Sequence, residues 1–93
     1  MFDWDDAKNQ RLIAERGISF ELVVQAVEKG KVLADRLVHH NSEKYPNQYL
    51  MIVEINGYAY NVPFVEQEDH TRFLKTVYPS RTATQKYLLR DTP

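Results

Sequence analysis

The stretch that decides the fold is residues 49–65, YLMIVEINGYAYNVPFV. Two runs rich in β-branched and aromatic residues flank the pair Asn56 and Gly57. A two-residue type I′ turn needs positive φ angles at both central positions, so an Asn-Gly pair between two such runs predicts an antiparallel hairpin. The first run is almost continuously apolar, which favours a central strand. Pro63 has no amide hydrogen, so its amide position is expected to face an unpaired side or a bulge.

Two helices are predicted before the hairpin. The first covers residues 4–16, with Asp5 or Asp6 at its start and Gly17 as its stop. At 100° per residue, one broad face of it holds Trp4, Ala7, Arg11, Leu12 and Ala14. Ser19 is a good N-cap for the second helix, which ends near Gly30 and repeats apolar residues at helical spacing, namely Phe20, Val23, Val24 and Val27. The short link between the two helices predicts a helical hairpin.

Further strands are predicted on both sides of the central hairpin. Residues 31–38 suggest a first strand, followed by a polar loop over residues 39–48. An acidic turn at residues 66–69 leads to a fourth strand over about residues 70–78. Ser80 then caps a closing helix that runs to about Leu89. The predicted fold is α+β, with a helical hairpin packed on a four-stranded antiparallel β-meander and a short C-terminal helix, in one domain spanning residues 1–93.

The composition places narrow limits on function. The net charge of −1 hides a split, because residues 1–70 carry 7 Lys and Arg against 12 Asp and Glu, whereas residues 71–93 carry 5 against 1. A local basic face on an acidic body is therefore expected. Without cysteine, disulfides and thiolate zinc sites are excluded. No apolar run approaches the roughly 18 to 20 residues of a membrane helix, and the acidic start is unlike a signal peptide, so we expect a cytosolic protein.

Three segments in this order resemble the BrnT-like toxins of bacterial type II toxin–antitoxin pairs, a group related in fold to the RelE/ParE superfamily. They are WD-x-x-K (Trp4, Asp5, Lys8), G-I-S-F-E (residues 17–21) and S-R-x-A (Ser80, Arg81, Ala83). The resemblance implies a small ribonuclease that cuts messenger RNA without a cofactor. It also implies a hetero-oligomer with a cognate antitoxin that carries a ribbon-helix-helix or similar DNA-binding part.

The chain departs from that group at two places. Where the group commonly has Lys-His before the Gly-Ile-Ser segment, this chain has Glu15 and Arg16, so a histidine able to carry protons is missing. Where the group commonly has an arginine at the start of the last strand, this chain offers Lys75 at one residue's offset. The general base and acid therefore stay unassigned.

Metal-independent RNA cleavage needs a base, an acid and fixed cations that stabilise the charged phosphorane. Arg81 is the best candidate cation, because its fork matches phosphate oxygens and the amides of Thr82 and Ala83 would lie beside it. The alternative is that Arg81 pairs with Asp5 or Asp6, or is solvated. The candidate catalytic residues are Arg81, Lys75, Lys8 and Arg16, and the candidate RNA-binding residues are Lys86, Arg90, Tyr78 and Tyr87.

Other chemistries are less well supported by the residues. His39, His40 and His70 are possible proton carriers, but no metal site is expected, because adjacent histidines in a strand face opposite sides. Two further functions stay open on the sequence. The chain could be a ParE-like toxin directed at gyrase, or it could serve only as the corepressor partner of a DNA-binding antitoxin.

Overall fold

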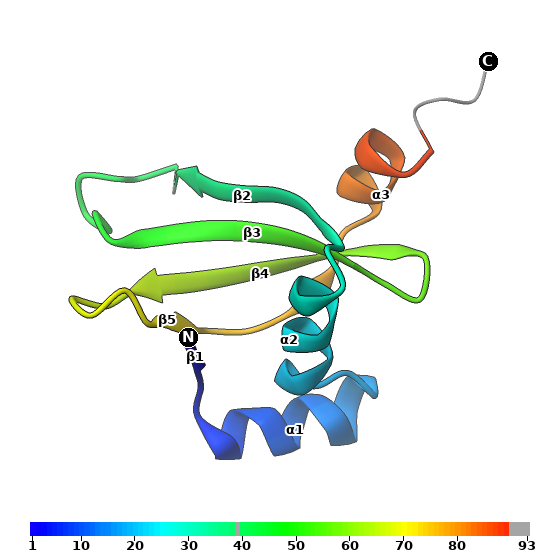
Figure 1. Ribbon diagram of the computed structural model, residues 1–93, viewed down its shortest axis with the longest axis horizontal. Coiled ribbons are helices and arrows are strands. Elements are labelled where there is room, and N and C mark those ends of the chain that lie inside the picture. The colour runs from blue at the N-terminus through cyan, green and yellow to red at the C-terminus, as the bar shows by residue number, and fades with distance from the viewer. Residues whose placement is uncertain (39, 90–93) are drawn as a thin grey trace.

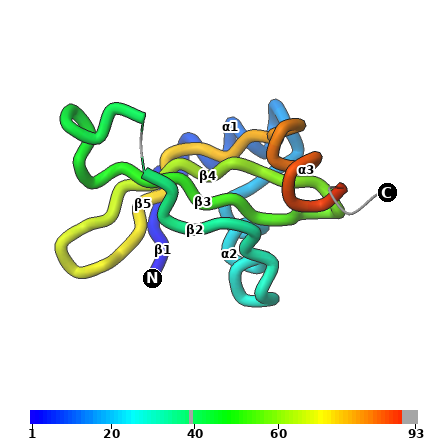
Figure 2. The backbone as a smooth tube through the Cα atoms, turned by 90° about the horizontal axis from the view of Figure 1, so that it is seen from above, coloured from blue at the N-terminus to red at the C-terminus, as the bar shows by residue number. Residues whose placement is uncertain are grey.

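The computed structural model describes residues 1–38 and 40–89, in which a six-stranded sheet carries α1 and α2 on one face and α3 on the other (Figure 1). The elements follow in the order β1 (Phe2–Asp3), α1 (Asp6–Arg16), α2 (Phe20–Glu28), β2 (Val32–Val38), β3 (Gln48–Ile55), β4 (Tyr58–Glu66), β5 (Arg72–Leu74), β6 (Tyr78–Pro79) and α3 (Arg81–Tyr87). Seen from above, α3 lies over one end of the sheet, while the loops that join β2 to β3 and β4 to β5 extend from the other end (Figure 2).

The central hairpin forms as its sequence predicts. β3 and β4 pair antiparallel along their whole length, from Gln48 opposite Val65 to Ile55 opposite Tyr58. Asn56 and Gly57 have φ angles of 54° and 78°, the left-handed values that a type I′ turn requires. The predicted caps are confirmed as well, since Asp5 caps α1, Ser19 caps α2 and Ser80 caps α3.

The predicted four-stranded antiparallel meander is wrong in detail. The main path of the sheet is β1-β5-β4-β3-β2, in which β1 pairs parallel with β5, and β6 is a separate strand on β4. The predicted fourth strand over residues 70–78 is broken between β5 and β6. Pro63 explains the break, because it lies opposite the gap and has no amide hydrogen to donate there. Its carbonyl accepts from the Lys75 amide at 2.8 Å, after which the chain leaves the ladder until Tyr78.

Alternation along β3 gives the sheet two apolar faces. Met51, Val53 and Ile55 belong to the main core, which α1, α2 and the link between them close with Leu12, Ile18, Phe20, Val23 and Ala26. On the opposite face Ile52 forms a smaller core with Ala83 of α3. None of the helices in the described part of the chain is long and apolar enough to cross a membrane.

Helix α1 buries a narrower stripe than its sequence predicts. Only Asn9 and Leu12 are buried, while three members of the predicted face are exposed, namely Ala7, Arg11 and Ala14. The first amides of a helix have no acceptor within the helix itself. Asn9 supplies one, because its Oδ1 accepts from the Phe20 amide at 2.8 Å and its Nδ2 donates to Glu21 at 2.8 Å. A hydrogen-bonded polar side chain, which was not part of the predicted face, is therefore buried on α1.

Candidate functional site

Arg81 lies directly after Ser80, the predicted N-cap of the closing helix. It is the first residue of α3 and is exposed, and its guanidinium has no hydrogen bond or ion pair to any residue among 1–38 and 40–89. The alternative pairing with Asp5 is not formed, because the Asp5 carboxylate caps α1 instead. One detail of the prediction is corrected: the Ala83 amide donates to Ser80 Oγ at 3.0 Å, so it is not available to a phosphate.

Arg16 reaches the same region from the end of α1. Its Nη1 donates to the carbonyl of Val77 at 3.0 Å, in the irregular segment between β5 and β6. Arg81 comes four positions after Val77, which limits the distance between their Cα atoms to about 14 Å. The structure thus brings two of the four predicted catalytic residues towards the end of the last strand.

The other two predicted catalytic residues are less closely placed. Lys75 follows the end of β5, is exposed, and has its ammonium 5.9 Å from the centre of the Phe73 ring. It therefore lies on the side of the chain away from buried Leu74. Lys8 is half-buried on α1, two turns before Arg16, so about 12 Å of helix axis separates them. The four residues do not form a compact catalytic centre.

The predicted RNA-binding residues differ in how exposed they are. Tyr78 is exposed in β6, whereas Tyr87 is half-buried against the smaller core, which favours a packing role. The exposed Lys86 ammonium lies 5.3 Å from the centre of the Tyr87 ring. Arg90 lies outside the described residues. Lys86 and Tyr87 also line an open groove of about 390 Å³ between α3 and strands β2 to β4.

A group of charged residues that the sequence did not predict lies at the end of the sheet from which the β2–β3 and β4–β5 loops extend. We call it the charge cluster, and it consists of Asp35, Arg36, Glu66, His70 and Arg72. Arg36 Nη2 is 2.5 Å from Glu66 Oε1, and His70 Nδ1 is 3.4 Å from Glu66 Oε2. Arg72 binds both oxygens of Asp35, at 2.8 and 3.1 Å.

Arg72 also stacks above the Phe64 ring, with its guanidinium carbon 4.5 Å from the ring centre. The hydrogen bond from Arg72 holds the pKa of Asp35 below its ordinary value, although partial burial of the carboxylate opposes that shift. Asp35 is therefore ionised, and it forms a bidentate ion pair with Arg72.

A bulge in β2 makes the charge cluster possible. Adjacent residues in a regular strand point to opposite faces, so Asp35 and Arg36 would be separated by the sheet. The register between β2 and β3 shifts between Ala34 and Leu37, and Arg36 has a φ of 52°. Both charged side chains consequently reach partners on the face that carries α1 and α2. Asp35 pairs with Arg72 of β5, and Arg36 pairs with Glu66 of β4.

Among the candidate proton carriers, His70 belongs to the charge cluster. His40 is exposed in the loop before β3, and His39 lies outside the described residues. The described residues contain no group of three or more His, Asp and Glu side chains suited to a metal ion.

Residues 9–79 match a family described as a domain of unknown function (DUF4258). This chain belongs to that family. The matched segment of the DUF4258 domain includes Arg16, Lys75 and the whole charge cluster, while Lys8 and Arg81 lie outside it.

A crystal structure of the Brucella abortus ribonuclease toxin BrnT shares the fold. The match has a TM-score of 0.50 at 22% sequence identity and covers 86% of this chain and 96% of that one. No curated protein sequence matches the chain.

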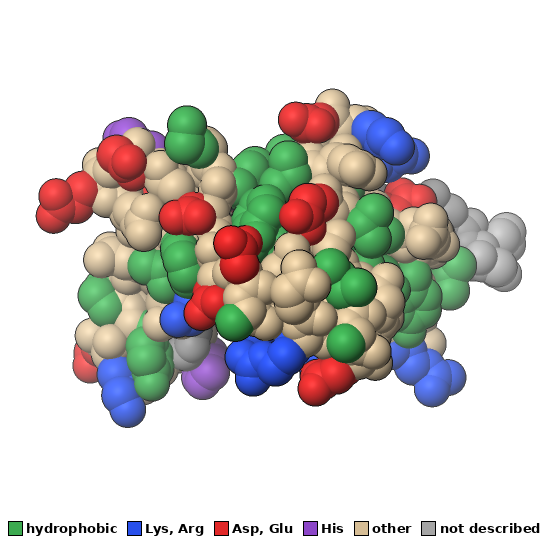
Figure 3. All heavy atoms as spheres, turned by 90° about the horizontal axis from the view of Figure 1, so that it is seen from below, with side chains coloured by type: hydrophobic (Ala, Val, Ile, Leu, Met, Phe, Trp, Pro, Cys, Tyr) green, Lys and Arg blue, Asp and Glu red, His purple; other side chains and the backbone are tan. Residues whose placement is uncertain are grey.

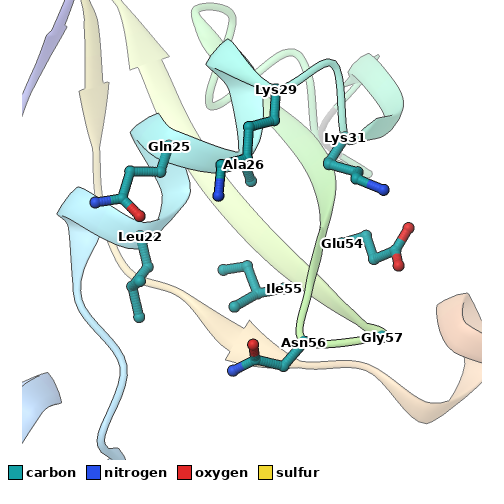
Figure 4. A pocket seen from close by; sticks show the side chains of 9 residues that line it. All are labelled: Leu22, Gln25, Ala26, Lys29, Lys31, Glu54, Ile55, Asn56 and Gly57. Atoms are coloured by element: carbon teal, nitrogen blue, oxygen red, sulfur yellow. The ribbon is translucent and has the colours of Figure 1, made fainter.

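The DUF4258 domain has another hollow, of about 310 Å³, between α2 and the tip of the central hairpin. Figure 4 shows Leu22, Ala26 and Ile55 in it, with the charged ends of Lys31 and Glu54 pointing away. No histidine lines this hollow, so it lacks a group for proton transfer near neutral pH. The face of the molecule seen in Figure 3 carries scattered carboxylates, in agreement with the acidic first part of the sequence.

Proposed function

We propose that this chain is the toxin of a type II toxin–antitoxin pair, a cytoplasmic, metal-independent endoribonuclease that cleaves messenger RNA. The observation that carries the proposal is the fold match with BrnT, a ribonuclease toxin, which spans nearly all of both chains. The DUF4258 family is then a relative of BrnT, and we place both in the wider RelE/ParE-like group. The three sequence segments shared with BrnT-like toxins support the same assignment.

The cationic end of the last strand is the proposed RNA contact. Arg81 is exposed without a protein partner among the described residues, so all its donors can meet a phosphate. Arg16 has one donor on Val77 and others to spare, and Lys75 extends the positive surface along the chain. Lys8 and Lys86 add charge further out, and Tyr78 offers an exposed ring on which a base can stack.

A cognate antitoxin with a DNA-binding domain is the proposed partner. The groove beside α3 has apolar walls from Leu37, Leu50 and Ile52, and Lys86 is the cationic residue that lines it. Arg81 lies in the chain between two other lining residues, Ser80 and Thr82. Such a surface suits an amphipathic segment with acidic residues on one side. An antitoxin bound there would cover Arg81 and so compete with RNA.

Cleavage of messenger RNA by the purified protein in EDTA tests the proposal. We expect fragments, because the site needs no metal. Arg81→Ala is expected to weaken RNA binding by roughly 10- to 100-fold, because a hydrogen bond to a charged group is worth about 1.5–3 kcal/mol. Lys29→Ala is the matched control, since Lys29 is an exposed cation at the far end of α2. Intact RNA with the parent protein would contradict the proposed activity.

A further inference from the structure

Glu66 contacts two other members of the charge cluster, Arg36 and His70. It is the last residue of β4, and its side chain is only 18% exposed. Its Oε1 is buried and lies 2.5 Å from Arg36 Nη2, and its Oε2 faces His70 Nδ1 at 3.4 Å. One carboxylate therefore holds an arginine and a histidine that come from different loops and strands.

The two side chains held by Glu66 stand on unusual backbone. Arg36 and His70 have φ angles of 52° and 68°, and the one other non-glycine residue with a positive φ in the described part of the chain is Asn56 of the hairpin turn. Such backbone persists where surrounding contacts over-determine it, and it is concentrated at functional sites. The bulge in β2 is also a feature that is common next to active sites, where bulges redirect side chains.

Arg36 and His70 are also the members of the cluster that solvent can reach. Their side chains are 48% and 85% exposed, so a bound molecule can contact them. Arg72 differs, because Asp35 takes both of its terminal nitrogens and Phe64 covers its plane. Arg72 and Asp35 thus support the cluster from the side, while Arg36 and His70 offer free donors and a free imidazole nitrogen.

We propose that Arg36 and His70 form the reacting pair of the RNA-cleaving site and that Glu66 is their positioning residue. This assignment rests on the proposed ribonuclease function. Glu66 favours the tautomer with the proton on Nδ1, which leaves Nε2 free to accept one. Nε2 takes the proton of a ribose 2′-hydroxyl, and the 2′-oxygen forms a bond to the adjacent phosphorus.

The bond from phosphorus to the 5′-oxygen then breaks, and the leaving oxygen takes a proton from water. Arg36 donates to the non-bridging oxygens while their negative charge grows. The products are a 2′,3′-cyclic phosphate and a free 5′-hydroxyl. Glu66 stabilises the imidazolium that forms, and His70 returns its proton to water before the next cycle.

The charges that face His70 are Glu66, Asp69 and, through Glu66, Arg36. Asp69 is ionised at neutral pH, because the hydrogen bond from the Thr71 amide lowers its pKa. Glu66 and Asp69 thus lie beside the exposed imidazole, and Arg36 is joined to it through Glu66.

The test is the cleavage of a single-stranded RNA oligonucleotide by the parent protein and by His70→Asn, Glu66→Gln and Glu68→Gln. Asparagine tolerates the left-handed backbone, so His70→Asn removes the imidazole and spares the turn. We expect kcat to fall by about 10²- to 10⁴-fold in His70→Asn with little change in KM, as for loss of a general base. Glu68→Gln, an exposed acid in the same turn, should cleave like the parent.

The pH profile separates reaction from mere structure. The parent's kcat should fall in acid, where a general base is already protonated, and Glu66→Gln should displace that fall along the pH axis, whereas a purely structural loss would leave its position unchanged. A flat parent profile, or His70→Asn cleaving at the parent's rate, overturns the inference while the ribonuclease function stands. If the parent cleaves no RNA, the proposed function fails, and this inference fails with it. The pH profile of the parent protein tests the inference even where a variant does not fold.

Discussion

Asn9 shows how much one buried amide decides in this chain. Its side chain accepts from the first amide of α2 and donates to Glu21, so a single residue joins the two helices. The same hydrogen bond from Asn9 lowers the pKa of Glu21. Because the pKa of the folded state is depressed, this contribution to stability is present above the ordinary carboxylate range and is lost as the pH falls through the lowered value.

Replacing Asn9 by Ala is therefore expected to destabilise the fold. The change leaves the buried Phe20 amide without its acceptor, which costs about 1–3 kcal/mol. Urea denaturation followed by circular dichroism measures the free energy of unfolding. Gln10→Ala, at the exposed neighbouring position, should stay within about 0.5 kcal/mol of the parent. Equal stabilities for Asn9→Ala and Gln10→Ala would show that the Asn9 amide has no such role.

At the scale of secondary-structure elements, the central hairpin depends on its turn. Gly57 has a φ of 78°, and no atom lies within 4 Å of where a Cβ would stand. The cost of Gly57→Ala is then conformational rather than steric with neighbours, about 1–2 kcal/mol for an L residue in this region. Thermal unfolding should show a lower midpoint for Gly57→Ala. Asn56→Gly should differ little from the parent, and a fall as large as that of Gly57→Ala would contradict the turn assignment.

The elements also show which parts of the structure a sequence reveals. The hairpin turn and the caps at Asp5, Ser19 and Ser80 are correctly predicted because a few adjacent residues determine each of them. The broken last strand follows from Pro63, whose missing amide is visible in the sequence, but its partner in the ladder is not. Pairing of β1 with β5 involves two residues on each side, too few to leave a pattern.

The charge cluster could not be predicted from the sequence, because it too depends on which strands pair. Asp35 and Arg36 read as opposite faces of one strand, and the bulge that brings them together depends on pairing with β3. Arg72 was not among the predicted site residues, although it begins β5 only three positions before Lys75. Arg81 at its corner was found because Ser80 and the preceding proline mark the turn in the sequence itself.

At the scale of the whole molecule, the acidic first part and the basic last part of the sequence give α3 a different charge from α1 and α2. α3 has no acidic residue in its first turn and carries Arg81 and Lys86, whereas α1 and α2 begin with Asp6 and Glu21. The apolar groove lies on the α3 side, where Leu37 is 37% exposed. A partner that is both acidic and amphipathic would therefore bind beside α3 rather than on the helical hairpin.

This prediction can be tested with the product of the adjacent reading frame, the expected antitoxin. Size-exclusion chromatography of the mixture should give a single complex that elutes before either protein. Leu37→Asp is expected to weaken binding by about 10- to 100-fold, because burial of one leucine is worth roughly 1.5–3 kcal/mol. Ile13→Asp is the matched control, since Ile13 is an exposed apolar residue on α1. If Ile13→Asp instead abolishes the complex and Leu37→Asp does not, the partner covers the helical hairpin, and the groove beside α3 is not its binding site.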